Sequence, residues 1–187
     1  YDDIALPIGL GQTLSQPLVV AMMTQALELT DRDTVLEIGT GSGYQAALLA
    51  MLARRVCTIE RHQQLSVEAQ HRFEMLKIRN IAAIHGDGMK GWPGSRATFS
   101  KIIITAAARR EVPPALVAQL DVGGVLVTPI GTSAVDQKLM RYRRVSANEI
   151  EAEYLMPVRF VPLLPEAELQ PDAIQNAPRP EGLLTAI

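Results

Sequence analysis

The sequence predicts an α/β fold in which a doubly wound, mostly parallel sheet is covered by helices. Short β-branched runs alternate with helical patterns over residues 34–128, and this alternation is typical of βαβ units. The runs are apolar almost throughout, which indicates strands that are buried on both faces. The chain has 187 residues, of which 48% are hydrophobic and 20% charged, so it is long enough and apolar enough for one globular domain with a core.

The helices and strands expected from this pattern follow in chain order. The first helix is expected within residues 15–29, where apolar side chains share one face. Pro17 suits its first turn, and Ser15 is a candidate for its N-cap. Strands are then expected at 34–38, 56–60, 81–85, 101–105 and 124–128, separated by helices at 44–53, 63–76 and 113–120.

The pattern changes after Thr128. Residues 137–145 and 153–163 read as two further strands joined by a polar turn, which we expect to add to the sheet in antiparallel fashion. From Pro165 onwards prolines recur without any apolar periodicity, which predicts a flexible tail. We therefore expect a single domain over residues 1–164 and a tail over residues 165–187.

Composition and charge argue against several kinds of partner and site. A net charge of -2 and a pI of about 5.9 argue against a protein held to nucleic acid by phosphate contacts. No apolar run approaches the roughly 20 residues that cross a bilayer, and no signal segment opens the chain. The single cysteine, Cys57, is expected as a buried thiol in a reducing cytoplasm. The histidines lack metal-ligand spacing, so no metal site is expected at His62, His71 or His85.

Three glycines follow the first strand of the expected sheet in the stretch LEIGTGSGYQ, residues 36–45. Gly39, Gly41 and Gly43 open the next helix, where glycine permits positive φ and lets a ligand approach the backbone. Tyr44 stands where the dinucleotide fingerprint GxGxxG requires its last glycine. The loop alone leaves open both a ligand site and a plain tight turn.

Three carboxylates are expected at the same edge of the sheet as this loop. Glu60 ends the second strand, where it can accept both hydroxyls of a ribose. Asp87 follows the third strand and can accept from an exocyclic adenine amine, while Glu37 precedes the loop and would lie near an ammonium group. S-adenosylmethionine combines these three groups without a phosphate, so the sequence predicts it as the ligand. A helix-capping Asp87 and a surface Glu60 are the alternatives.

Several motifs together resemble the protein-L-isoaspartate O-methyltransferase family. They include GQTLSQP (11–17), VLEIGTGSGYQAALLA (35–50), HGDG (85–88) and VRFVPL (158–163), and the resemblance covers residues 1–164. It implies a Rossmann-like class I methyltransferase that transfers a methyl group from S-adenosylmethionine to the free α-carboxyl of L-isoaspartyl residues. Methylation would initiate repair of aged proteins and peptides through a succinimide, and we expect the enzyme to be a cytoplasmic monomer that binds neither nucleic acid nor membranes.

The resemblance also implies roles for individual residues. Ser15 would orient the substrate carboxylate as a hydrogen-bond donor, not as a covalent nucleophile, although a purely helix-capping Ser15 is the competing interpretation. Thr13 would line the same pocket, and Val158, Arg159 and Phe160 would offer an exposed strand edge to the substrate peptide. The residues implied to bind the cofactor are Glu37, Gly39, Thr40, Gly41, Ser42, Gly43, Glu60, Arg61, Gly86, Asp87, Gly88, Thr105 and Gln137.

The sequence departs from the family pattern at two places. A helical segment is expected before YDDIALPIG, yet the sequence begins at Tyr1. Leu18 stands where an aromatic residue or a histidine often follows the proline of the SxP motif. Two alternative functions remain open: a methyltransferase acting on a small molecule or RNA, and a module that binds S-adenosylmethionine without catalysis.

Overall fold

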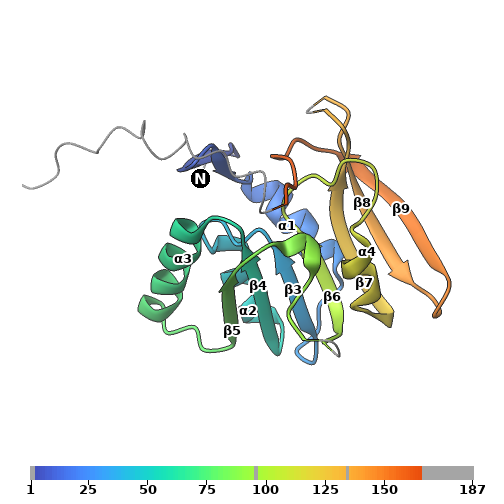
Figure 1. The fold of residues 1–187 in the computed structure, drawn as a ribbon, viewed down its shortest axis with the longest axis horizontal. Helices are drawn as coiled ribbons and strands as arrows, with labels where there is room; N and C mark the ends of the chain where they lie inside the picture. The colour runs from blue at the N-terminus through green and yellow to red at the C-terminus, as the bar shows by residue number, and fades with distance from the viewer. Residues whose placement is uncertain (1–2, 95–96, 134, 166–187) are drawn as a thin grey trace, which may run out of the picture.

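The computed structural model describes residues 3–94, 97–133 and 135–165. A seven-stranded sheet runs through it in the order β5-β4-β3-β6-β7-β8-β9 (Figure 1). The first five of these strands pair in parallel, whereas β8 and β9 are antiparallel, as the sequence predicts. The strands are β3 (Thr34–Ile38), β4 (Arg55–Glu60), β5 (Ile81–His85), β6 (Phe99–Ile104), β7 (Leu120–Ile130), β8 (Lys138–Arg144) and β9 (Ile150–Pro157).

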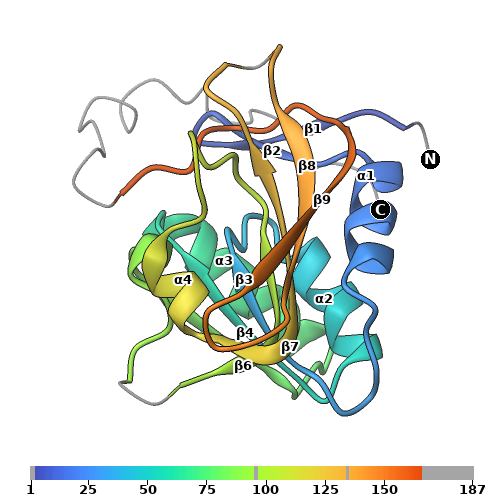
Figure 2. The same ribbon diagram turned by 90° about the vertical axis from the view of Figure 1, so that its right-hand side faces the viewer.

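Helices cover both faces of this sheet because successive residues of each strand point to opposite sides. Val35 and Ile103 pack in a core cluster with residues of α1 (Pro17–Ala26), α2 (Tyr44–Leu52) and α3 (Gln63–Met75). Their neighbours Leu36 and Ile102 pack on the other face, against α4 (Pro114–Ala118). Figure 2 shows α1 and α2 on one side of the sheet and α4 on the other.

A short N-terminal hairpin, which the sequence pattern does not reveal, precedes α1. Its strands β1 (Leu6–Gly9) and β2 (Gln12–Leu14) pair antiparallel. Gly9 and Gly11 take positive φ at the turn, a conformation that glycine adopts without strain. The hairpin lies at the upper end of the molecule in Figure 1, beyond the ends of the parallel strands.

The structure corrects three of the predicted element boundaries. Ser15 is not the N-cap of α1: Gln16 occupies that position, and its side chain makes no cap hydrogen bond. The fourth predicted helix is shorter, because β7 already begins at Leu120. The last strand ends at Pro157, so Val158–Phe160 is not the predicted strand edge.

The last strand ends at Pro157, which pairs with Lys138, the first residue of β8, and a side chain binds the chain beyond it. The Gln137 amide accepts from the backbone N–H of Phe160 and donates to the backbone carbonyl of the same residue at 3.0 Å. These are the groups that a continuing strand would use for its ladder. Between Phe160 and Pro165, where the described residues end, the chain makes one isolated bridge, from Pro162 to Ala107.

Three further expectations concern Cys57, membrane-spanning helices and the C-terminal tail. Cys57 is buried as predicted, and burial raises the pKa of its thiol. Within the described ranges, no helix is long and apolar enough to cross a membrane. Apart from Pro165, the predicted tail lies outside the described residues, so its flexibility stays a prediction.

The packing of the glycine loop against α3 yields a first testable prediction. Gly43 has a φ of 86°, and a Cβ added there would lie 2.7 Å from the Phe73 ring. We expect Gly43→Ala to lower the free energy of unfolding by roughly 2–4 kcal/mol, from overpacking and a left-handed backbone together. Gly123→Ala is the matched control, because Gly123 has a φ of 81° but no atom near its added Cβ. Equal losses in urea unfolding of the two variants would contradict the packing argument.

Candidate functional site

The carboxyl ends of β3, β4 and β6 meet at one edge of the sheet, and backbone hydrogen bonds join the loops that leave them. The N–H of Gly39 donates to the Ile59 carbonyl at 2.9 Å, and the N–H of Thr105 donates to the Ile38 carbonyl at 2.9 Å. In open α/β sheets this edge is where ligands bind. The glycine loop 39–43 is therefore held between two neighbouring strands at the expected binding edge.

The close approach of Thr105 explains the first glycine of the loop. Gly39 has a φ of 95°, and a Cβ there would collide with the Thr105 hydroxyl. That hydroxyl donates to the Gly39 carbonyl at 2.6 Å. A side chain at position 39 would thus be strained and would break the contact between the loop and the end of β6.

Glu60 joins the glycine loop to the start of α3. One carboxylate oxygen accepts from the Gly41 N–H at 2.9 Å, and the other accepts from the His62 N–H at 2.9 Å. The residue is only 4% exposed, so the surface alternative for Glu60 is wrong. Each oxygen keeps a second lone pair, which leaves the carboxylate able to accept from a ligand hydroxyl.

Two narrow pockets adjoin the glycine loop. The first is lined by Gly39, Gly41, Glu60, Arg61, Gly88 and Thr105, among others. The second shares the loop and is lined also by Thr13, Ser15, Thr40 and Ser42. Most of the residues implied for the cofactor and two implied for the substrate thus lie together.

Ser15 lines the second pocket with a hydroxyl that has no hydrogen-bond partner among the described residues. It lies just before α1, within the segment that runs from the hairpin into the helix. In the described part of the chain this hydroxyl makes no hydrogen bond, either as a cap of α1 or elsewhere. The helix-capping interpretation of Ser15 is therefore wrong, and the hydroxyl is free to bind a ligand.

Glu37 lies beneath the loop and is fully buried. The Thr58 hydroxyl donates to its Oε2 at 2.5 Å, and the Thr40 hydroxyl lies 2.6 Å from that of Thr58. Its Oε1 has no hydrogen-bond partner among the described residues. Burial, with a smaller contribution from the charge of Glu60, raises the pKa of Glu37 to about 8, so the carboxyl holds a proton at neutral pH.

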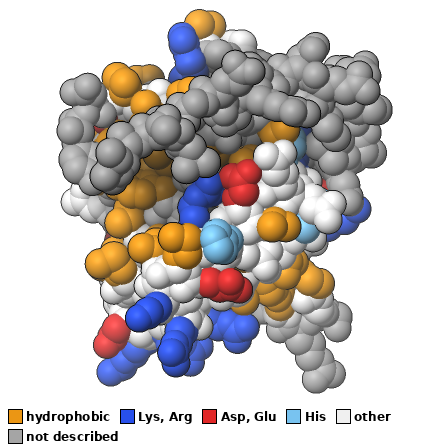
Figure 3. Space-filling view, turned by 90° about the vertical axis from the view of Figure 1, so that its left-hand side faces the viewer, with side chains coloured by type: hydrophobic (Ala, Val, Ile, Leu, Met, Phe, Trp, Pro, Cys, Tyr) orange, Lys and Arg blue, Asp and Glu red, His pale blue; other side chains and the backbone are white. Residues whose placement is uncertain are grey.

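Arg61 and His62 form a polar wall of the first pocket. The Arg61 Nε donates to the His62 Nε2 at 3.2 Å, while the Arg61 Nη1 is buried without a partner among the described residues. Burial lowers the pKa of His62. Figure 3 shows acidic, basic and histidine side chains meeting at a hollow on the β5 side of the molecule.

Other predicted site residues lie outside these pockets. Asp87 caps the short 3-10 helix η1 (Gly88–Lys90), accepting from the Met89 N–H at 2.9 Å, as the capping alternative proposes. Gly86 donates its N–H to the Glu60 carbonyl.

Gln137 and Phe160 line a larger cavity next to these pockets. Among the remaining substrate residues, Val158 donates its N–H to the Gln137 carbonyl, and Arg159 is exposed.

Sequence reasoning missed the segments that cover the first pocket. Ile8 and Gln12 reach it from the hairpin, and Val161–Leu164 cross it after the end of β9. Neither segment has a hydrophobic period that points to a site. The GQTLSQP and VRFVPL motifs, which overlap these segments, were the available signal.

Comparisons with known proteins converge on one family. The sequence model of protein-L-isoaspartate(D-aspartate) O-methyltransferase matches residues 1–168. A protein-L-isoaspartate O-methyltransferase of Rhodospirillum centenum is 55% identical over 181 residues, which are 97% of this chain and 78% of the relative. One from Azorhizobium caulinodans is 57% identical over 164 residues, 88% of this chain and 74% of the relative.

Solved structures give the same fold. A protein-L-isoaspartate O-methyltransferase superimposes with a TM-score of 0.77 at 28% identity, over 87% of this chain and 53% of that longer chain. A Plasmodium falciparum protein described as an isoaspartate methyltransferase, in complex with S-adenosyl-L-homocysteine, superimposes with a TM-score of 0.75. The latter is 24% identical and covers 88% of this chain and 81% of its own, so it supports the fold alone.

The buried Glu37 predicts a pH dependence of stability. Its pKa in the folded protein, about 8, lies above its ordinary value of 4.5. The stabilisation linked to its bound proton is therefore complete below pH 4.5 and is lost as the pH rises through 8. We expect the free energy of unfolding of the ligand-free protein to fall between pH 5.5 and 8.5, and to fall less steeply in Glu37→Gln. Urea unfolding across this range measures both slopes.

An exposed carboxylate provides the control for this measurement. Glu149 lies on the exposed turn between β8 and β9, so Glu149→Gln should leave the wild-type slope in place. A Glu37→Gln protein with the full wild-type slope would show that another group titrates in this range.

Proposed function

The chain belongs to the protein-L-isoaspartate(D-aspartate) O-methyltransferase family, and we propose from this premise that it methylates the free α-carboxyl of L-isoaspartyl residues with S-adenosylmethionine as donor. Its substrates are isoaspartyl-containing proteins and peptides, and methylation initiates their repair through a succinimide. The observation that carries the proposal is the free Ser15 hydroxyl beside the family's glycine loop, in a chain that matches the family over residues 1–168.

The side chains at the edge of the sheet fit this donor. The Glu60 carboxylate, with lone pairs to spare, suits the ribose hydroxyls, and the unpaired Glu37 Oε1 suits the ammonium group. A Cβ added at Gly39 would collide with the Thr105 hydroxyl, and one added at Gly41 would crowd the Ile8 side chain of the hairpin. Glycines therefore let the loop stay beside the pockets that would receive the methionyl part. For the adenine amine we propose Asp87, which follows the carboxyl end of β5 and whose carboxylate also accepts from the Met89 N–H.

Binding requires the covering segments to move. The two pockets beside the loop have volumes of about 70 and 40 Å³, below the roughly 300 Å³ of a typical ligand pocket. The hairpin lines both pockets, and Val161–Leu164 line the first. We infer that these two segments separate to admit the donor and then exclude water from it.

The protein contributes to this reaction mainly by positioning the substrate carboxylate against the methyl group, and less by acid–base catalysis. When bound, S-adenosylmethionine supplies an electrophilic methyl group on its sulfonium. The substrate carboxylate has a pKa of roughly 4, so it is already ionised at neutral pH and needs no strong general base. Ser15 donates to one carboxylate oxygen and aims the other, while Thr13 lines the same pocket. A neutral donor orients the nucleophile without the loss of reactivity that a paired cation would cause.

Further properties belong to the same proposal. We propose that residues 1–164 act as one domain, which the two continuous core clusters on the faces of a single sheet support. We further propose that the protein acts as a monomer in the cytoplasm, where its single buried thiol stays reduced.

Paired peptides test the proposed function. The protein is incubated with S-adenosylmethionine carrying a labelled methyl group and with peptides that contain either isoaspartyl or normal aspartyl at one position. We expect base-labile label in the isoaspartyl peptide alone. Label in RNA or a small molecule instead would favour a different methyltransferase, and donor binding without any transfer would favour a binding module.

Replacement of the orienting hydroxyl tests the mechanism. We expect Ser15→Ala to lower kcat/KM for the isoaspartyl peptide by roughly 10- to 100-fold, the worth of one hydrogen bond to a charged group. Donor affinity, measured by calorimetry, should change by less than about twofold. The control is Ser146→Ala, in the turn between β8 and β9. Loss of thermal stability and donor binding in Ser15→Ala would assign the serine a structural role.

A further inference from the structure

A large cavity lies against the covering segment on the side away from the glycine loop. Its volume is about 980 Å³, and its walls come mainly from residues 107–111, 131–133 and 162–165, with Gln137 and Phe160. Pro162, Leu163 and Leu164 line both this cavity and the first narrow pocket. One short segment thus separates the predicted reaction site from a space large enough for several side chains.

Hydrogen bonds to neighbouring segments hold the walls of this cavity. Ala107 bonds across the covering segment, since its N–H donates to the Val161 carbonyl and its carbonyl accepts from the Leu163 N–H, both at 2.8 Å. Ala108 bonds in the same way to the end of β7, through Pro129 and Gly131, both at 2.9 Å. The cavity is therefore formed before any ligand arrives.

Charged side chains project from the wall that these bonds fix. Arg109, Arg110 and Glu111 are exposed, whereas Ala108 before them and Val112 after them are buried. Across residues 3–94, 97–133 and 135–165, neither arginine forms an ion pair or a side-chain hydrogen bond. Two unpaired guanidinium groups against one carboxylate give the cavity an excess of positive charge.

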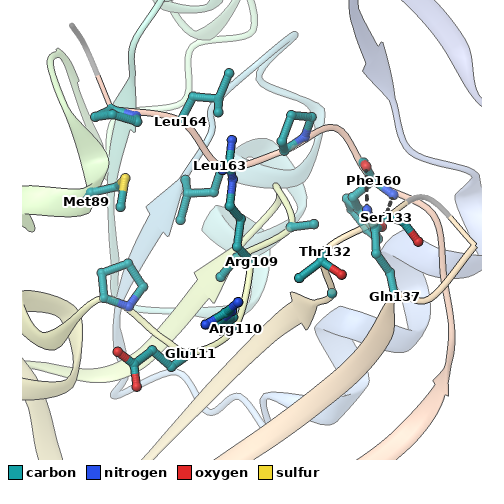
Figure 4. A pocket seen from close by; sticks show the side chains of 16 residues that line it. Met89, Arg109, Arg110, Glu111, Thr132, Ser133, Gln137, Phe160, Leu163 and Leu164 are labelled. Carbon is teal, nitrogen blue, oxygen red and sulfur yellow. Dashed lines mark hydrogen bonds between the residues drawn. The ribbon is translucent and has the colours of Figure 1, made fainter. Parts of the chain in front are cut away.

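The close-up view shows how these groups lie. Arg109 stands in the middle of the cavity and extends toward Leu163 and Leu164, while Glu111 lies at the margin away from Gln137 and Phe160 (Figure 4). The hydrogen bonds between Gln137 and Phe160 close the opposite wall. The guanidinium group of Arg109 therefore lies beside the covering segment, whereas Arg110 and Glu111 lie farther from it.

We propose that this cavity receives the residues flanking the isoaspartyl residue, and that Arg109 and Arg110 make the enzyme favour acidic flanks. The inference rests on the proposed function. A polypeptide substrate continues beyond the carboxylate that reacts, so its flanking side chains must lie in space next to the narrow pockets. Guanidinium groups bind carboxylates through paired, charge-assisted hydrogen bonds, and two neighbouring arginines suit two acidic side chains.

Peptides that differ only in flanking charge test this inference. Isoaspartyl peptides carry two Glu, two Gln or two Lys residues on one side or the other of the isoaspartyl residue. We expect kcat/KM to be about threefold to tenfold higher with Glu than with the isosteric Gln on the side that enters the cavity, and lowest with Lys. The preference should shrink in 0.5 M salt, since exposed charges are screened over roughly 4 Å there.

Two variants with the same change in net charge assign the preference to the cavity. In Arg109→Gln/Arg110→Gln the ratio of kcat/KM for Glu-flanked over Gln-flanked peptides should fall to about one. The control is Arg55→Gln/Arg79→Gln, since these arginines line a separate depression at the amino ends of β4 and β5. The control should keep the wild-type ratio.

The outcomes separate this inference from the function on which it rests. Methylation of all isoaspartyl peptides without a charge preference, or a preference that survives in Arg109→Gln/Arg110→Gln, would overturn the inference and leave the function in place. If both double variants lost the charge preference equally, the preference would arise from the net charge of the protein, and the inference would again be overturned. Failure to methylate any isoaspartyl peptide would refute the function and the inference together.

Discussion

The paired hydrogen bonds of the Glu60 carboxylate are the interaction on which the rest of the site depends. They tie the N–H of Gly41 to the N–H of His62, and so they set the distance between the glycine loop and the start of α3. Hydrogen bonds from backbone N–H groups to a carboxylate are charge-assisted, and His62 is the N-cap of α3, where a negative charge is favoured. Because this carboxylate also faces the first pocket, the same group shapes the loop and offers acceptors to a ligand.

The carboxyl group of Glu37 lies next to that of Glu60 but differs from it in protonation. Glu37 is fully buried, and both its burial and the charge of Glu60 raise its pKa. Two adjacent carboxylates would repel each other, whereas a neutral Glu37 beside a charged Glu60 does not. The two carboxyl groups at this edge thus differ in charge, one ready to accept from hydroxyl groups and one held neutral until a cation approaches it.

Sequence reasoning reached the parallel strands and the glycine loop because periodicity and glycine spacing are local properties. It placed β3 and β5 at their observed bounds, and it predicted the burial of Cys57 and the presence of two antiparallel strands after β7. It could not foresee that β9 ends at Pro157, opposite the first residue of β8, or that the Gln137 amide binds the backbone of Phe160, because both contacts join residues far apart in the chain. The hairpin before α1 was missed for a related reason: its strands are too short to show an alternation, and its positive φ values fall on Gly9, Leu10 and Gly11.

Two buried polar atoms show why the site and the stability of the fold are coupled. Glu37 Oε1 and Arg61 Nη1 have no hydrogen-bond partners within the described ranges, and one such group costs roughly 1–3 kcal/mol. Arg61 lines the first pocket, and Glu37 lies under the loop that borders both pockets. A fold optimised for stability alone would pair or remove these groups. Both atoms lie beside the glycine loop, so a ligand that pairs with them would raise the free energy of unfolding as it binds.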